Sequence, residues 1–163
     1  MLNHLTHTNR KSVVKTMNLV FMLTILCLTH SCDKKYINIH DFEYNEWAKF
    51  DTIDFNFNIN DTTKTYDLSF FFRNSINYSY RNLFLLIDLN HNGKIIQIDT
   101  VEYKIADKYG KWLGRGLGNM KDNYLIFNQN MMFNKEGVYK IRIRHGMRQD
   151  PLLGVNKLGL QIK

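Results

Sequence analysis

The chain of 163 residues contains only two cysteines, and it has no apolar run long enough to span a membrane. A membrane-spanning helix needs about 20 mostly apolar residues, whereas the apolar run Met17–Leu28 is shorter and is broken by Asn18 and Thr24. Cys27 lies inside this run and Cys32 follows it, so no cysteine occurs after residue 32. We therefore expect no membrane-spanning helix and, beyond Cys32, neither a disulfide nor a thiolate metal site.

The chain also lacks the residue patterns that commonly carry catalysis. It contains no Gly-x-Ser-x-Gly nucleophile elbow and no glycine-rich phosphate-binding loop. Three histidines follow residue 32, namely His40, His91 and His145, and no two of them have the spacing of metal ligands. A carboxylate pair for glycoside hydrolysis has no distinguishing signal either. We predict that the protein is not an enzyme and holds no cofactor.

The net charge is mild once the N-terminal segment is set aside. The formal charge of the chain is +7, but three basic residues and no acidic ones precede residue 32, which leaves a balance of +4. Nucleic-acid binding usually requires a clustered basic face, and most basic residues here are scattered. The one local group alternates with two isoleucines and predicts the solvated face of a strand: Lys140, Arg142 and Arg144. Nucleic acid is therefore not an expected partner.

The N-terminal segment has the order of a lipoprotein leader. Three basic residues precede the run Met17–Leu28, which is followed by Thr-His-Ser-Cys and then by Asp-Lys-Lys. A basic start, a short apolar core and a small residue before the cleavage point indicate a secretory signal peptide. We predict that residues 1–31 are removed and that the sulfur of Cys32 carries the lipid, with plain secretion as the alternative. Thr29 stands where such leaders usually have leucine, and the start at Met1 or at Met17 remains open.

After Cys32 the pattern indicates a short tether followed by a β domain. Residues 32–46 are mostly polar and predict a tether that lifts the domain off the bilayer. From residue 47 onward, apolar and polar residues alternate in short segments separated by turn signals such as Asn92-Gly93, which favours an antiparallel β-sandwich over residues 47–163. The expected strands are 53–59, 66–73, 83–89 (more central), 94–105 (interrupted near Thr100), 124–127, 138–145 and 158–162.

One segment matches the pattern of a calcium-binding loop. Asp88, Asn90 and Asn92 supply oxygen ligands at positions 1, 3 and 5, and Asp99 stands at position 12. Asn-Gly between two apolar segments is also the strongest short signal for a β-hairpin. Both flanks are β-rich rather than helical, and position 12 is not the usual bidentate glutamate. We therefore favour the hairpin and predict no metal.

A second segment has three glycines within five residues beside a tryptophan, Trp112-Leu-Gly-Arg-Gly-Leu-Gly118. Such spacing predicts a backbone held in a tight and unusual path. In one interpretation Trp112 and Arg115 contribute to a contact surface, since both residue types dominate interfaces. In the other, which we favour, the loop is shaped by glycine and Trp112 packs into the core. An envelope glycan-binding module with exposed aromatic side chains is a further alternative.

Several segments together resemble a known family. They are Leu83–Gly93, the Asp99-Thr100 step, Gly110–Gly116, Met147-Arg148, Leu153–Val155 and Leu158–Leu160. The chain is similar, from about Trp47 to Ile162 and including the leader, to the gliding motility-associated lipoprotein family GldH of Bacteroidota. The resemblance implies a lipid-anchored cell-envelope protein, with a periplasmic domain and partners in gliding motility and type IX secretion. It also implies no enzymatic activity and makes Arg148 a third candidate contact residue.

Three short segments fit the O-glycosylation pattern of the same phylum, in which Asp-Thr is followed by an apolar residue or threonine. These are Asp51-Thr52-Ile53, Asp61-Thr62-Thr63 and Asp99-Thr100-Val101. Thr52, Thr62 and Thr100 are therefore hypothetical glycosylation sites.

Overall fold

The computed structural model of the chain describes residues 36–163. The leader, its cleavage point and Cys32 lie outside the described residues. The elements are β1 (Tyr36–Asp41), the 3-10 helix η1 (Glu43–Asn45), β2 (Glu46–Trp47), β3 (Ile53–Ile59), β4 (Thr65–Ser75), β5 (Asn82–His91), β6 (Lys94–Lys104), β7 (Met120–Met132), β8 (Gly137–His145), β9 (Leu152–Leu153) and β10 (Val155–Ile162). Within this part of the chain, no helix is long and apolar enough to cross a membrane.

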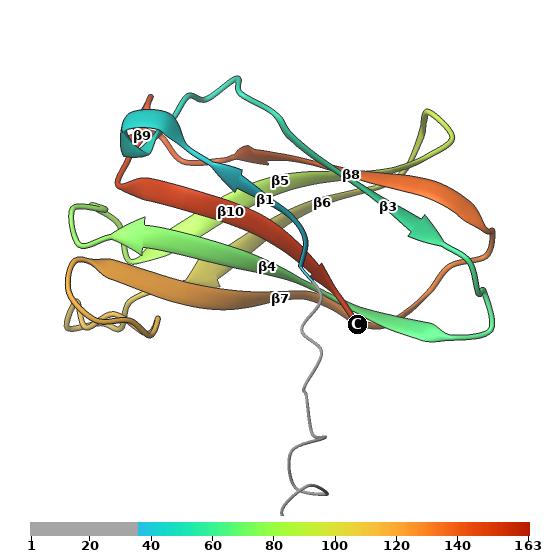
Figure 1. Cartoon of the computed structure of the whole chain (residues 1–163). Helices are drawn as coiled ribbons and strands as arrows, with labels where there is room; N and C mark the ends of the chain where they lie inside the picture. Colours follow the sequence, from blue (N-terminus) through green and yellow to red (C-terminus); the bar gives the residue numbers. More distant parts are fainter. Residues whose placement is uncertain (1–35) are drawn as a thin grey trace, which may run out of the picture. The chain divides into compact units, whose positions relative to one another are not determined.

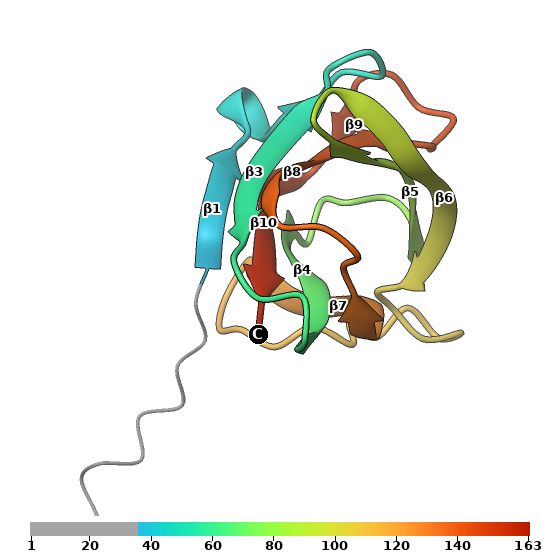
Figure 2. The same cartoon turned by 90° about the vertical axis from the view of Figure 1, so that its right-hand side faces the viewer.

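The strands form two four-stranded sheets, ordered β1-β10-β4-β7 and β3-β8-β5-β6, and a small third sheet of β2 and β9. All strand pairs are antiparallel. The two larger sheets pack face to face, as Figures 1 and 2 show from two sides. The alternation of apolar and polar residues along the strands explains this packing. In β3, for example, the apolar residues are buried while Asn56 and Asn58 between them are exposed. The predicted antiparallel β-sandwich is confirmed.

The strands predicted from alternation are all present, with some changes of length. β5 lies between β8 and β6, as its apolar sequence predicted. The expected interruption of β6 near Thr100 is wrong, since Thr100 pairs with Leu86 in an unbroken ladder. β7 extends well beyond the predicted residues 124–127 at both ends. The basic face of β8 is also as expected, because Arg142 is exposed and binds Asp54 while Ile141 and Ile143 are buried.

The prediction that the polar tether extends to residue 46 is wrong. Residues 36–41 form β1, which pairs with β10, and the next apolar residues, Phe42 and Trp47, are buried. The residue pattern did not predict this strand, because residues 38–41 of β1 are all exposed. Backbone pairing rather than burial of side chains holds β1 in place. An edge strand of this kind shows no alternation of buried and exposed positions. The folded domain therefore begins by residue 36.

Trp47 is a buried core residue that contacts two further rings. It is fully buried, and its Nε1 donates a hydrogen bond to the carbonyl of Asp51 at 3.0 Å. Phe42 lies 4.9 Å from the indole, and the imidazole of His145 packs edge-on at 5.3 Å, measured between ring centroids. β2 and β9 pair beside it, with Trp47 opposite Leu152.

His145 makes the stability of the domain sensitive to pH. Burial lowers the pKa of this imidazole; the backbone of Trp47 and the charges of Asp150 and Asp51 oppose that shift only in part, and Lys49 acts in the same sense as burial. The unfolded chain therefore binds a proton at a higher pH than the folded chain, so stability falls as the pH drops below about 6.5. We expect the urea midpoint to fall from pH 7.5 to pH 5, and we expect His145→Leu to flatten that slope. An unchanged slope in the variant would contradict this assignment.

The sandwich has two distinct ends, which the strand register defines. At one end, here called the turn end, lie the short connections 60–64, 92–93 and 133–136, since Ile59 pairs with Gly137 and His91 pairs with both Lys94 and Tyr139. At the other, the loop end, lie the connections 76–81, 105–119 and 146–151, beyond the pairs Ser75–Met120 and Asn82–Lys104. In Figure 1 the turn end is on the right and the loop end on the left.

Candidate contact surface

The connection between β6 and β7, residues 105–119, is long but is held at successive points along its path. Oδ1 of Asp107 accepts hydrogen bonds from the backbone N–H groups of Tyr109 and Lys111, at 2.8 and 2.9 Å. Trp112 then forms an isolated bridge with Ala106, and the N–H of Leu113 donates to the carbonyl of Ile105 at 2.9 Å. The first half of the connection is thus folded back on the end of β6.

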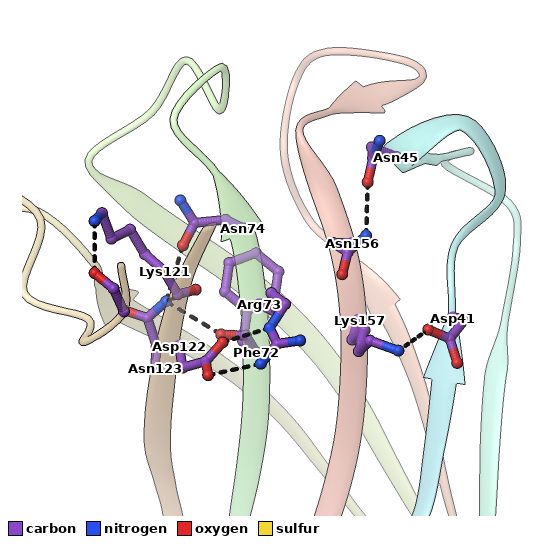
Figure 3. Close-up of polar contacts among 11 residues, drawn as sticks. Asp41, Asn45, Phe72, Arg73, Asn74, Lys121, Asp122, Asn123, Asn156 and Lys157 are labelled. Carbon is purple, nitrogen blue, oxygen red and sulfur yellow. Dashed lines mark hydrogen bonds and ion pairs between the residues drawn. The ribbon is translucent and has the colours of Figure 1, made fainter. Parts of the chain in front are cut away.

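The second half is fixed on the start of β7. Arg115 and Asp122 exchange two backbone hydrogen bonds, of 2.9 and 2.6 Å. Nζ of Lys121 donates to the carbonyls of Gly116 and Gly118, at 2.9 and 3.2 Å. The charged end of Lys121 therefore holds the carbonyls of Gly116 and Gly118 near the start of β7, and Figure 3 shows one contact of this side chain.

The three glycines of this segment are each favoured by a different feature of the local backbone. A Cβ on Gly114 would lie 2.6 Å from Oδ1 of Asn123 and 2.9 Å from the carbonyl oxygen of Asp122. A Cβ on Gly116 would lie 2.5 Å from the carbonyl oxygen of Met120, and its φ of +144° is unfavourable for other residues. Gly118 has a φ of +67° with open space around it. The tight, unusual backbone path predicted from the glycine spacing is present.

A network of polar side chains on β4 and β7 lies beside the loop and supports it (Figure 3). The buried amide of Asn123 donates to the carbonyl of Phe72 at 3.1 Å and to Oδ1 of Asn74 at 2.9 Å. Asp122 binds Arg73 through two hydrogen bonds of 2.5 and 2.8 Å, and this pairing raises the pKa of Arg73. Because these groups belong to β4 and β7, the second half of the loop is supported by two paired strands at the edge of the sheet.

Held in this way, the loop presents large apolar side chains to solvent. Leu117 is 100% exposed, Tyr109 is 83% exposed and Leu113 is 57% exposed. Exposed cationic side chains stand before and between them along the chain: Lys108, Lys111 and Arg115. We call residues 108–118 the display loop. Exposed apolar side chains with cationic neighbours, on a backbone held by hydrogen bonds, are typical of an interaction surface.

Two adjoining hollows flank the display loop, and both include Lys104 and Leu113. The larger, of about 760 Å³, also contains Tyr80, Arg81 and Glu102. The smaller, of about 390 Å³, lies between Arg115 and Tyr124. Both are open and mixed in polarity. Within residues 36–163 no group of three or more His, Cys, Asp or Glu side chains is placed to hold a metal ion.

The structure places the three predicted contact residues differently. Trp112 is half-buried and packs against the core, and neither hollow includes it. Arg115 is exposed and lines the smaller hollow. Arg148 is exposed in the connection between β8 and β9 at the same loop end. Among the described contacts and hollows, none joins Arg148 to the other two.

The calcium-loop pattern folds as the hairpin between β5 and β6. Asn92 and Gly93 form its turn, with φ values of +50° and +78°. Asp88 pairs with Ile98, whereas Asp99 pairs with Ile87, so the two carboxylates point to opposite faces of the sheet. They cannot bind one ion together. The ligand spacing of a calcium loop is therefore present in sequence only.

The three candidate glycosylation sites lie at the surface. Thr52 is exposed just before β3, and Thr100 is exposed on the outer face of β6. Thr62 is half-buried in the turn between β3 and β4, where the carboxylate of Asp61 is bound by Thr63 and Lys64. These contacts lower the pKa of Asp61 to about 2.

Sequence analysis missed the most exposed residues of this surface. Leu113 and Leu117 stand between the glycines, and their spacing alone cannot show whether they are buried or exposed. Tyr109 follows Asp107, a residue type that often starts a turn. Together with Gly110, that signal could have indicated an exposed turn. The contacts by which Lys121 and Asp122 hold the loop could be seen only in the folded structure.

Comparisons with known proteins agree with the lipoprotein interpretation. A model of the GldH lipoprotein family matches residues 34–162. A gliding motility lipoprotein GldH homolog of Christiangramia forsetii is 36% identical over 152 residues, covering 88% of this chain and 93% of that protein. The gliding motility lipoprotein GldH of Flavobacterium johnsoniae is 28% identical, with 87% and 93% covered.

Among solved structures, a family GH115 4-O-methyl-α-glucuronidase aligns with a TM-score of 0.41 and 12% identity. That alignment covers 79% of this chain and 18% of the enzyme, and similarity of this extent supports no conclusion about function. The family match, by contrast, covers nearly all the described residues. The chain belongs to the GldH lipoprotein family.

Proposed function

We propose that this protein is a non-enzymatic lipoprotein of the cell envelope that acts in gliding motility and the associated type IX secretion apparatus through protein contacts. Lipid on Cys32 holds it to a membrane, and the domain lies in the periplasm. Family membership and the names of the two relatives support the motility role. The tether between Cys32 and β1 is only a few residues long, which keeps the domain close to the bilayer.

The observation that carries the contact role is the display loop. Burying a leucine stabilises a protein by about 1.5–3 kcal/mol, yet Leu113 and Leu117 remain outside the core on a backbone fixed by Lys121 and Asp122. A loop fixed in advance loses little conformational entropy when a partner covers it. The cations along the loop suit a partner with an acidic rim.

The same proposal includes O-glycosylation at Thr52, Thr62 and Thr100. The exposure of Thr52 and Thr100 supports it, because a glycosyltransferase needs access to the hydroxyl. Intact-mass measurement of the native protein, before and after Thr52→Val and Thr100→Val, tests this proposal. Native protein without added hexose would remove it.

Replacing the two exposed leucines of the display loop tests the contact role. We expect Leu113→Ser with Leu117→Ser to reduce colony spreading several-fold, because a partner that covers a leucine removes apolar surface from water, which is worth about 1.5–3 kcal/mol when the burial is complete. Thermal stability of the purified variant should stay within about 0.5 kcal/mol of the parent, since both side chains are exposed.

The matched control is Leu153→Ser on β9, whose side chain is also exposed but lies outside the display loop. This control should spread normally. Normal spreading by the double variant, at unchanged protein level and membrane attachment, would show that the display loop is not the contact surface.

A further inference from the structure

The length of chain between the anchor and the fold limits how the domain can stand on a membrane. Three residues lie between Cys32 and Tyr36, where β1 begins, so the four residue steps from Cys32 to Tyr36 extend over at most about 14 Å. Tyr36 pairs with Gln161 and Gln161 with Ser69, which is four residues from the start of β4 at the turn end. At about 3.3 Å per residue, this is about 13 Å from that end.

The loop end is farther from the start of β1. Ser69 is six residues from Ser75, where β4 ends at the loop end opposite Met120, which is about 20 Å at the usual strand rise, and the display loop lies beyond that point. A lipid on Cys32 can therefore reach the plane of the turn end, but it cannot bring the display loop to the same bilayer while the sandwich stands upright.

Apolar side chains gather on the turn end, although it has only short connections. Ile95, Ile96, Met132 and Val138 are each between 53% and 62% exposed. Ile96 and Met132 line one hollow of about 340 Å³ together with Lys135. Val138 lines a neighbouring hollow with Asn92 and Gly93, at the turn beside Ile95. We call these four apolar residues the end patch.

We propose that the end patch rests in the interface of the lipid bilayer that holds the anchor, so that the domain stands upright with the display loop directed away from that membrane. This inference rests on the proposed anchoring at Cys32. Lys94 and Lys135, both exposed, flank the patch and can reach lipid phosphates while their aliphatic stems cover apolar surface. Glu136 lies at the same end, and Asp61 pairs with Lys64 at 3.0 Å, so apolar contact rather than net charge carries the attraction.

The orientation also separates the two surfaces by role. One exposed apolar cluster faces the anchoring membrane, and the other, at the opposite end, stays free for a protein partner. The contact function proposed above needs this arrangement, because a display loop buried in lipid could not bind a partner at the same time.

Brominated lipids test the orientation, because they quench tryptophans that lie in the bilayer. The core that the structure describes lies within residues 36–163, so a chain of residues 32–163 should fold alone. In this chain Cys32 is the sole thiol, so it can be coupled to a maleimide lipid in vesicles of phosphatidylethanolamine and phosphatidylglycerol. Coupling in this way does not depend on natural acylation, so a failure of the anchoring proposal would not affect the result.

We expect Ile95→Trp to add a strong quenched component, relative to the parent chain with its Trp47 and Trp112. Leu117→Trp, which is matched in size and exposure, should add fluorescence that brominated lipid does not quench. Equal and weak quenching at both positions would overturn the inference, and so would stronger quenching at Leu117 than at Ile95. Ile96→Asn with Met132→Asn should lower the quenching of Ile95→Trp, and unchanged quenching would count against the end patch.

Discussion

A Cys32→Ala variant is expected to lose membrane attachment completely. A thioether-linked diacylglyceryl group, extended by an amide-linked chain, buries many CH₂ groups, and each contributes about 0.8 kcal/mol of membrane affinity. Nothing on the domain approaches that total, since the end patch offers only partly exposed side chains. Labelling with palmitate should mark the wild type and leave the variant unmarked, and fractionation should move the variant to the soluble periplasm.

Cys27→Ala is the matched control, because Cys27 lies inside the predicted leader and should be removed with it. This variant should be labelled and sedimented as the wild type is. Wild-type protein that takes up no palmitate and remains soluble would contradict lipid anchoring at Cys32, and plain secretion would then be the better account.

Replacing Gly116 by alanine is expected to destabilise the domain by about 2–5 kcal/mol. Strained backbone at a positive φ costs about 1–3 kcal/mol, and overpacking costs about as much again. Both apply here, because φ is +144° and the new Cβ would lie 2.5 Å from the backbone carbonyl oxygen of Met120, which cannot rotate away. Urea unfolding should show the loss, and the display loop should become accessible to proteases.

Gly118→Asn provides the comparison within the same loop. Its φ of +67° suits asparagine and no atom lies within 4 Å of the added Cβ, so the cost should stay below about 1 kcal/mol. If both variants unfold at the same urea concentration as the parent, the loop is not held in the conformation described.

The fold could be predicted from sequence wherever a strand buries one face. β3 shows this best, because its four buried residues alternate with three polar ones. The same signal could not reveal β1, whose residues 38–41 are exposed, or the two-residue strands β2 and β9, which are too short to show a period. Backbone hydrogen bonds hold these elements, and such bonds leave no pattern of residue types.

The candidate site could be predicted only in outline. The glycine spacing indicated a constrained loop, since Gly114 and Gly116 each need the absence of a Cβ. The partners that create this need, Asn123 and Met120, are brought close only by the fold. Asp88 and Asp99 show the opposite error, because a spacing that suits a calcium loop places them on opposite faces of a hairpin.

Site-specific photocrosslinking from Leu117 tests the central claim most directly, because this side chain is fully exposed on the display loop. A photoreactive residue placed there, in otherwise native membrane-anchored protein, should give a discrete adduct with a protein of the gliding or type IX secretion apparatus. The same residue at Leu153 should give none. Absence of any protein adduct at Leu117 in motile cells, or adducts with lipid alone, would contradict the claim that the protein acts through contacts made by this loop.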